Sequence, residues 1–252
     1  MATDHTKLYI PGDVLGTLKH CGGYYRRPTL DDPIVGYAST YLDGGLRKNF
    51  VGFEFFNCTK AQEYPRVTEL WAEDIARVIR NHPDLSADTL FAAPMGGILF
   101  AQMVALKLGA RIIYGVRKTT KTATDGSGRD ESAILLDRHE FKKGEQVAIV
   151  DDVCNNFGTV GRLIALALSQ GAVVVAILAI VNRSGNFSYA VRDPHHGYVI
   201  PAISLLTVPA IKFRQDEAEV ARHVREGNIY WNPKNPEQWS KLIEIMKRRS
   251  EA

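Results

Sequence analysis

One apolar run, VVVAILAIV at Val173–Val181, constrains the fold of this chain more than any other feature. A strand with one face in water alternates apolar and polar residues, whereas this run contains no polar residue. Such a strand must be covered on both faces, which is typical of a parallel sheet flanked by helices. The run therefore predicts an α/β fold.

Strand and helix patterns alternate on the amino-terminal side of that run. Thr89–Ala93 is a short apolar strand, and Ile98–Leu108 has the pattern of a helix. Arg111–Val116 is again strand-like, and Val147–Val150 begins a second unit that ends in Val173–Val181. Both units predict right-handed crossovers in an open, mostly parallel twisted sheet with helices on both faces. The helix of the second unit has apolar positions at helical spacing: Val160, Leu163, Ile164, Ala167 and Leu168.

The segments outside this α/β core differ from it in composition. Residues 1–66 are rich in glycine, proline and aromatic residues, and we expect them to form a small N-terminal hood. Residues 67–205 hold the predicted core, and 206–252 are expected to form a helical extension packed on it. Further segments have helical patterns: Glu69–Arg80, Gln215–Gly227 and Pro236–Arg249.

Composition and charge argue against several classes of protein. The formal net charge is only +3 and no basic stripe is present, so we expect no nucleic-acid partner. No apolar run approaches the roughly 18 residues of a membrane span. The cysteines, Cys21, Cys58 and Cys154, are odd in number and lack metal-ligand spacing. Without a secretory signal, this pattern predicts reduced thiols in a cytoplasmic protein.

Lys118–Asp130, KTTKTATDGSGRD, contrasts with the apolar core. It has no apolar residue beyond Ala123, and it carries Gly126 and Gly128. Such a segment cannot bury much surface, so the composition predicts a mobile loop.

Two adjacent carboxylates, Asp151 and Asp152, follow the apolar strand Val147–Val150. In open α/β sheets, ligands bind outside the carboxyl ends of the strands. Neighbouring carboxylates repel each other unless a ribose diol or a cation such as Mg²⁺ meets them. The next helix directs its N-terminal amides to the same place, where an anion is stabilised. The pattern therefore favours a sugar phosphate, and the alternative is a solvated turn.

Other nucleotide and hydrolase motifs are absent from the sequence. It contains no G-x-x-x-x-G-K-[ST] phosphate loop and no G-x-G-x-x-G after a strand, which argues against P-loop and dinucleotide-binding folds. It also lacks the G-x-S-x-G elbow and the H-E-x-x-H zinc motif.

Val147–Thr159, VAIVDDVCNNFGT, resembles the phosphoribosyl-pyrophosphate (PRPP) motif of the type I phosphoribosyltransferases. The resemblance implies that Asp151 and Asp152 hold the ribose hydroxyls, and Mg²⁺ directly or through those hydroxyls and water. It differs at Asn156, where the family usually has threonine, and at Phe157, where glycine is usual. Asparagine can donate side-chain amides and tolerates left-handed turn conformations. The implied phosphate-binding turn comprises Asn155, Asn156, Phe157, Gly158 and Thr159.

Two further segments resemble the orotate branch of this family. Arg117, Lys118 and Lys121 form the R-K-x-x-K pattern that opens its catalytic loop. The resemblance implies that Lys121 reaches pyrophosphate, often in a neighbouring subunit's site; the alternative is a solvated basic loop. Pro94–Gly97 matches the short loop that contacts pyrophosphate, and this implies phosphate contacts for Met95, Gly96 and Gly97.

The resemblance also implies a base-binding region within the hood. Phe55 and Phe56 resemble the aromatic pair that lies beside the base, and Lys48 resembles a lysine that meets PRPP. The alternative for the aromatics is a half-buried strand. Arg183 ends the run Val173–Val181 where the orotate enzymes have a base-binding arginine. A guanidinium fork suits the carboxylate and carbonyl of orotate, although a surface ion pair is the alternative.

Together these resemblances imply an orotate phosphoribosyltransferase that uses PRPP, orotate and Mg²⁺ to form orotidine 5′-monophosphate and pyrophosphate. They further imply a cytoplasmic homodimer whose subunits share the mobile loop, with no nucleic-acid or membrane partner. Two alternatives stay open: a phosphoribosyltransferase for another nucleobase, and a non-catalytic PRPP-sensing regulatory protein.

Overall fold

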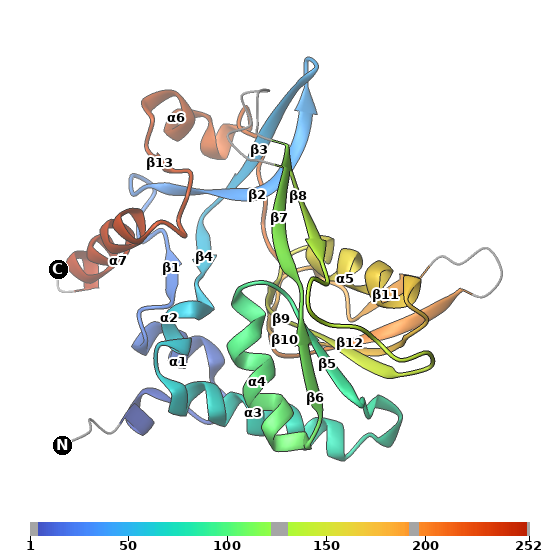
Figure 1. The fold of residues 1–252 in the computed structure, drawn as a ribbon. Coiled ribbons are helices and arrows are strands. Elements are labelled where there is room, and N and C mark those ends of the chain that lie inside the picture. The colour runs from blue at the N-terminus through green and yellow to red at the C-terminus, as the bar shows by residue number, and fades with distance from the viewer. Residues whose placement is uncertain (1–4, 122–130, 192–196, 251–252) are drawn as a thin grey trace. The chain divides into compact units, whose positions relative to one another are not determined.

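The computed structural model of the chain describes residues 5–121, 131–191 and 197–250 (Figure 1). The chain divides into two compact units. The first unit comprises Met1–Cys21, Cys58–Lys118 and Ser132–Ala210, and the second comprises Gly22–Asn57, Thr119–Glu131 and Ile211–Ala252. The predicted division into 1–66, 67–205 and 206–252 stays a prediction.

The first unit is built on a six-stranded sheet with the order β11-β12-β10-β9-β5-β6. Its strands pair in parallel except β11, which is antiparallel at one edge. This confirms the predicted open, mostly parallel α/β sheet. The strands are β5 (Thr89–Ala92), β6 (Arg111–Tyr114), β9 (Gln146–Cys154), β10 (Val173–Asn182), β11 (Ser188–Val191) and β12 (Tyr198–Thr207).

Helices cover the sheet because its strands are apolar on both faces. The helix α5 packs on the face that carries Val147 and Ile149, and its predicted apolar stripe lies in that core. The helix α4 packs against β5 and β9, and α3 packs against α4. The helical elements of this unit are η1 (His5–Leu8), α1 (Val14–His20), α2 (Cys58–Gln62), α3 (Pro65–Arg80), η2 (Pro83–Leu85), α4 (Gly96–Leu108) and α5 (Gly158–Ser169).

The segment predicted as a mobile loop, Lys118–Asp130, begins differently from that prediction. Residues 118–121 belong to the strand β7 (Val116–Lys121), which pairs with β8 (Glu131–Leu135) in a two-stranded sheet. The loop prediction is therefore wrong for these residues, since backbone pairing with β8 overrides their polar composition. Residues 122–130 lie outside the described part of the chain.

The second unit joins segments from distant parts of the sequence. The C-terminal strand β13 pairs in parallel with β2, and β3 pairs with β2 on its other side. Trp239 of α7 is buried against Tyr25, Val35 and Tyr37. The elements are β1 (Tyr24–Arg26), β2 (Ile34–Asp43), β3 (Leu46–Gly52), β4 (Glu54–Phe56), α6 (Ala218–Glu226), β13 (Ile229–Tyr230) and α7 (Pro236–Ser250). Among the described residues, no helix is both long and apolar enough to cross a membrane.

A buried acid, Glu145, ties together the amino-terminal ends of three strands of the large sheet. Its carboxylate accepts hydrogen bonds from the Thr89 hydroxyl at 2.5 Å, the Lys142 amide at 2.8 Å and the Arg111 guanidinium at 3.0 Å. Burial alone raises the pKa of this carboxyl, but these donors outweigh it and hold the pKa below its ordinary value. The charged form is therefore the form that the fold stabilises.

We expect Glu145→Gln to lower the free energy of unfolding at pH 7 by about 2 kcal/mol, since charge-assisted hydrogen bonds are lost. A depressed pKa contributes stability that is present above the unfolded-state pKa and is lost as pH falls through the folded-state value. The variant should therefore lose less stability than the parent below about pH 4. Urea unfolding at several pH values measures this, with the exposed Glu140→Gln as the control. Equal acid sensitivity in parent and variant would contradict this role.

Candidate functional site

The acids Asp151 and Asp152 lie inside the last part of β9 rather than after it, because the strand continues to Cys154. On one side Asp151 pairs with Ala179 of β10, whereas pairing with β5 stops at Val150. Pairing with β10 therefore continues past the acids, whereas the register with β5 ends just before them. Asp151 is 9% exposed, and its Oδ1 accepts the Asp152 amide at 2.9 Å.

The interior next to these acids disfavours further negative charge. Cys154 is buried behind them, and its thiol pKa is raised above the ordinary value, first by burial and then by the charges of Asp151 and Asp152. The thiol therefore stays neutral, which fits the prediction of a reduced cysteine but gives it no role as a nucleophile.

The loop Pro94–Gly97 lies directly against Asp152. A Cβ on Gly96 would come within 2.5 Å of the Asp152 carboxylate, and a Cβ on Gly97 within 2.6 Å of the Val150 carbonyl oxygen. At Gly97 the close neighbour is backbone, so only glycine fits there, whereas at Gly96 the close neighbour is a side chain. The structure thus brings the predicted pyrophosphate loop and the predicted ribose-binding acids together at the carboxyl ends of β5 and β9.

Gln62, a residue of α2 that belongs to no sequence motif, holds this loop in place. Its Nε2 donates to the Gly96 carbonyl oxygen at 2.8 Å, and the side chain is buried. Met95, which precedes Gly96 in this loop, is 82% exposed. A glutamine in a short helix carries no motif, so only the tertiary contact reveals its position.

The basic residues of β7 are Arg117, Lys118 and Lys121. Arg117 is exposed, and its guanidinium donates to the Pro94 carbonyl oxygen at 3.5 Å, so it lies beside the loop. Lys118 is also exposed, and its Nζ lies 3.4 Å from Asp137 Oδ1. Lys121 is the last residue of β7, and its side chain is outside the described part of the structure.

The predicted phosphate turn precedes α5. Asn155, Asn156 and Gly158 are exposed, and Thr159 is half-buried. The Asn156 Oδ1 accepts the Gly158 amide at 3.1 Å, so this asparagine already satisfies one amide at the helix start.

The left-handed position of this turn is occupied by Phe157, with φ of 55°. It is the one non-glycine residue with positive φ among those the structure describes. The left-handed residue of the turn is thus Phe157, not one of the neighbouring asparagines, which tolerate this conformation more readily. For an L-residue with a Cβ the conformation costs roughly 1–2 kcal/mol. The Phe157 side chain is 7% exposed and belongs to the core under α5.

Arg183 follows β10 beside the end of β9. Its amide donates to the Cys154 carbonyl oxygen at 2.7 Å, and its own carbonyl oxygen accepts the Ala210 amide at 2.9 Å. These bonds fix the backbone close to the acidic strand end. The side chain is 2% exposed, which differs from a surface ion pair. A surface ion pair, the alternative for this arginine, therefore does not fit its burial, and base binding by Arg183 stays a prediction.

The remaining predicted residues, Lys48, Phe55 and Phe56, belong to the second unit. Lys48 Nζ donates to Asp43 Oδ2 at 2.7 Å, and this bond raises the pKa of the lysine. Phe56 is buried against Tyr24, with ring centroids 4.9 Å apart. Phe55 is half-buried and lies 6.0 Å from the Trp239 ring.

The acids of β9 fit a magnesium ion that arrives with its substrate. Within the described ranges, no cluster of three or more His, Cys, Asp or Glu side chains is suited to hold a metal. Mg²⁺ is commonly bound by one or two carboxylates together with phosphate oxygens and water. Asp151 and Asp152 supply carboxylates of this kind beside a loop and a helix start that can receive phosphate.

No family model matches the chain, but known proteins are similar to it in sequence. It is 25% identical over 169 residues to an orotate phosphoribosyltransferase of Thermoanaerobacter sp. (strain X514), covering 67% of this chain and 77% of the relative. It is 29% identical over 133 residues to an orotate phosphoribosyltransferase of Thermotoga maritima, covering 52% of this chain and 63% of the relative. The matched region therefore spans less than two thirds of the second relative.

The fold is also similar to a solved structure. The crystal structure of orotate phosphoribosyltransferase from Aeropyrum pernix matches with a TM-score of 0.50 and 18% sequence identity, covering 78% of this chain and 94% of that chain. This likeness concerns the fold. The resemblance inferred from Val147–Thr159 is thereby confirmed: the chain has the type I phosphoribosyltransferase fold and is related in sequence to proteins named orotate phosphoribosyltransferase.

Proposed function

We propose that this protein is an orotate phosphoribosyltransferase that transfers the 5-phosphoribosyl group of PRPP to orotate. The observation that carries the proposal is the contact of Gly96 with the Asp152 carboxylate, 2.5 Å from where a Cβ would stand. This contact brings the loop Pro94–Gly97, whose backbone amides are suited to pyrophosphate, beside acids that are suited to a ribose diol. The choice of orotate as the base is supported by the names of the relatives, which are orotate phosphoribosyltransferases.

In the proposed reaction the bond from the anomeric carbon to pyrophosphate breaks and a bond to the orotate nitrogen forms. No protein nucleophile is required, so the rate gain comes from alignment and from electrostatic stabilisation. Asp151 and Asp152 hold the ribose hydroxyls and favour positive charge on the sugar. Arg117, Lys118 and Lys121 offset the charge on departing pyrophosphate.

The remaining predicted residues contact the phosphate groups of PRPP or the base. Met95, Gly96 and Gly97 contact pyrophosphate, and Lys48 contacts PRPP. The turn from Asn155 to Thr159 receives the 5-phosphate. Asp151 and Asp152 would hold Mg²⁺, directly or through the PRPP hydroxyls and water, and the ion would offset phosphate charge. Phe55 and Phe56 flank the base.

Base choice in this proposal depends on Arg183. We expect Arg183→Ala to lower kcat/KM for orotate about 100-fold while the KM for PRPP changes less than about threefold, because a planar cation for the acidic base is lost. Initial rates at varied orotate and varied PRPP measure this, with the exposed Arg138→Ala as a matched control. Thermal unfolding of both variants monitors the loss of a buried side chain. An equal rise in both KM values would contradict a role in base choice.

The non-catalytic PRPP-binding alternative would use the same phosphate turn as the proposed enzyme, so only turnover separates the two. The proposals are separated by incubating the purified protein with PRPP, Mg²⁺ and one base at a time: orotate, uracil, adenine, hypoxanthine or guanine. We expect turnover of orotate. Turnover of another base supports a different transferase, and PRPP binding by calorimetry without turnover of any base supports the sensor.

We further propose that the protein acts in the cytoplasm as a homodimer in which the segment around Lys121 serves the neighbouring subunit's site. Light scattering of the purified protein tests the dimer. Mixing inactive Lys121→Ala with inactive Asp152→Asn protein tests the sharing, because a mixed dimer regains one complete site if the lysine acts across the interface. Activity no higher than that of either variant alone, after subunit exchange, contradicts it.

A further inference from the structure

The turn before α5 adopts a conformation that its own sequence does not favour. Phe157 has a left-handed backbone, a conformation that glycine adopts freely and phenylalanine rarely does. Its carbonyl oxygen accepts the Gly161 amide at 2.6 Å, and its neighbours Asn156 and Gly158 are joined by a hydrogen bond. The backbone of Phe157 thus sets where the first amides of α5 point. Something outside the turn must hold it.

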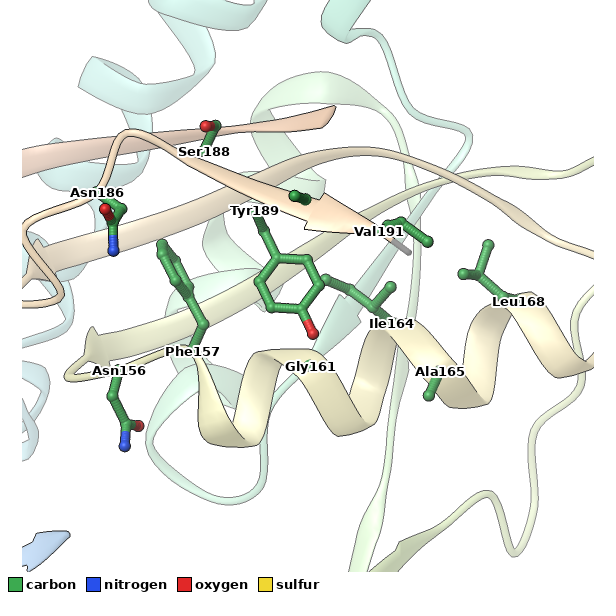
Figure 2. A pocket seen from close by; sticks show the side chains of 11 residues that line it. Asn156, Phe157, Gly161, Ile164, Ala165, Leu168, Asn186, Ser188, Tyr189 and Val191 are labelled. Carbon is green, nitrogen blue, oxygen red and sulfur yellow. The ribbon is translucent and has the colours of Figure 1, made fainter. Parts of the chain in front are cut away.

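The side chain of Tyr189, on β11, is placed to do so. The Phe157 ring points toward β11, and the Tyr189 ring lies between β11 and α5 (Figure 2). The ring centroids are 5.9 Å apart at 79°, an edge-to-face contact of the favourable kind. The Tyr189 hydroxyl lies over Gly161, where a Cβ would come within 2.8 Å of it. Tyr189 therefore meets both the ring of Phe157 and the first turn of α5.

The surroundings give Phe157 space to move if Tyr189 is removed. Both side chains line an open groove of about 610 Å³ between α5 and β11 (Figure 2). The groove is also lined by Ile164, Ala165 and Leu168 of α5 and by Asn186, Ser188 and Val191 on or beside β11. Truncating Tyr189 would enlarge this groove.

We infer that Tyr189 is a positioning residue for the proposed 5-phosphate site and that it acts through Phe157. Packing of the two rings takes the place of the glycine that related motifs carry at position 157, because it holds the left-handed backbone that glycine would adopt alone. This inference rests on the proposed function for the identity of the ligand. The coupling between Tyr189 and Phe157 does not depend on the proposed function.

A double-mutant cycle tests the inference. In the natural background, Tyr189→Ala should raise the KM for PRPP about tenfold, with kcat and the KM for orotate changing less than about twofold. Tyr189→Phe keeps the ring and should restore a KM near that of the parent. In a Phe157→Gly background, Tyr189→Ala should change the KM for PRPP less than about twofold, since glycine does not need the packing. The same factor in both backgrounds would overturn the inference.

A second measurement needs no substrate. Hydrogen exchange of the Gly158 and Gly161 amides should be faster in Tyr189→Ala than in the parent or in Tyr189→Phe, with amides of β5 unchanged. Unchanged exchange in Tyr189→Ala overturns the coupling, whatever the kinetics show. Faster exchange in a protein that neither binds PRPP nor turns over any base supports the coupling and refutes the proposed function instead.

Discussion

Asp152→Asn is expected to lower kcat at least about 100-fold, the loss typical of removing one group that stabilises transition-state charge. The substitution keeps the size and shape of the side chain and removes only its charge. Asp152 is half-buried and lies beyond the last residue of β9 in register with β5, so we expect the fold to tolerate the loss of its charge. Steady-state kinetics with PRPP and orotate measure the loss, and thermal unfolding checks the fold.

The exposed acid Asp84, in η2, supplies the control, because Asp84→Asn removes the same charge away from β9. It should keep the kcat of the parent. If Asp152→Asn retains turnover, the reaction does not need this charge. If the variant unfolds under conditions where Asp84→Asn is folded, the acid is structural. Either result would contradict the proposed mechanism.

Gly96→Ala and Gly97→Ala are expected to fail in different ways. The new methyl at Gly96 would meet the carboxylate of Asp152, which can turn aside, so we expect kcat/KM to fall about 100-fold through misplacement of a reacting group. The new methyl at Gly97 would meet the backbone of Val150, which cannot move without disturbing β9. There we expect the free energy of unfolding to fall by about 2 kcal/mol.

Parallel kinetics and urea unfolding of these variants separate the effects. Gly96→Ala should unfold within about 0.5 kcal/mol of the parent, as substitutions outside packed regions do. An equal loss of stability in the two variants would mean that Gly96 serves packing alone. In that case its approach to Asp152 would carry no argument for a site.

The parts of the fold that the sequence predicted are those governed by apolar periodicity. The run Val173–Val181 lies in the central strand β10, which is buried on both faces from Ala176 onward, as its apolar composition predicts. The boundaries of elements were less predictable: β9 continues through Asp151 and Asp152 because pairing with β10 continues, and a carboxylate pattern gives no sign of backbone pairing. Lys118–Lys121 is likewise held in a strand by β8, which its own composition does not suggest.

The candidate site was predictable where it resembles a family motif and unpredictable where it depends on tertiary contacts. The order of Asp151, Asp152 and the following turn can be seen in the sequence. The support of the loop by Gln62 and of the turn by Tyr189 cannot, because these side chains come from α2 and β11 and belong to no local pattern. The role of Phe157 also required the structure, since the residue looks unsuited to its position until its packing is known.

The proposed reaction at Asp152 and Gly96 is the transfer of a phosphoribosyl group from PRPP to orotate. Its most direct test is to follow orotate consumption and pyrophosphate release together, with purified protein, PRPP and Mg²⁺, in the parent and in Asp152→Asn. We expect equal amounts of orotidine 5′-monophosphate and pyrophosphate from the parent, and at least about 100-fold slower formation of both from the variant. No PRPP-dependent loss of orotate in the parent, or the same rate in both proteins, would contradict it.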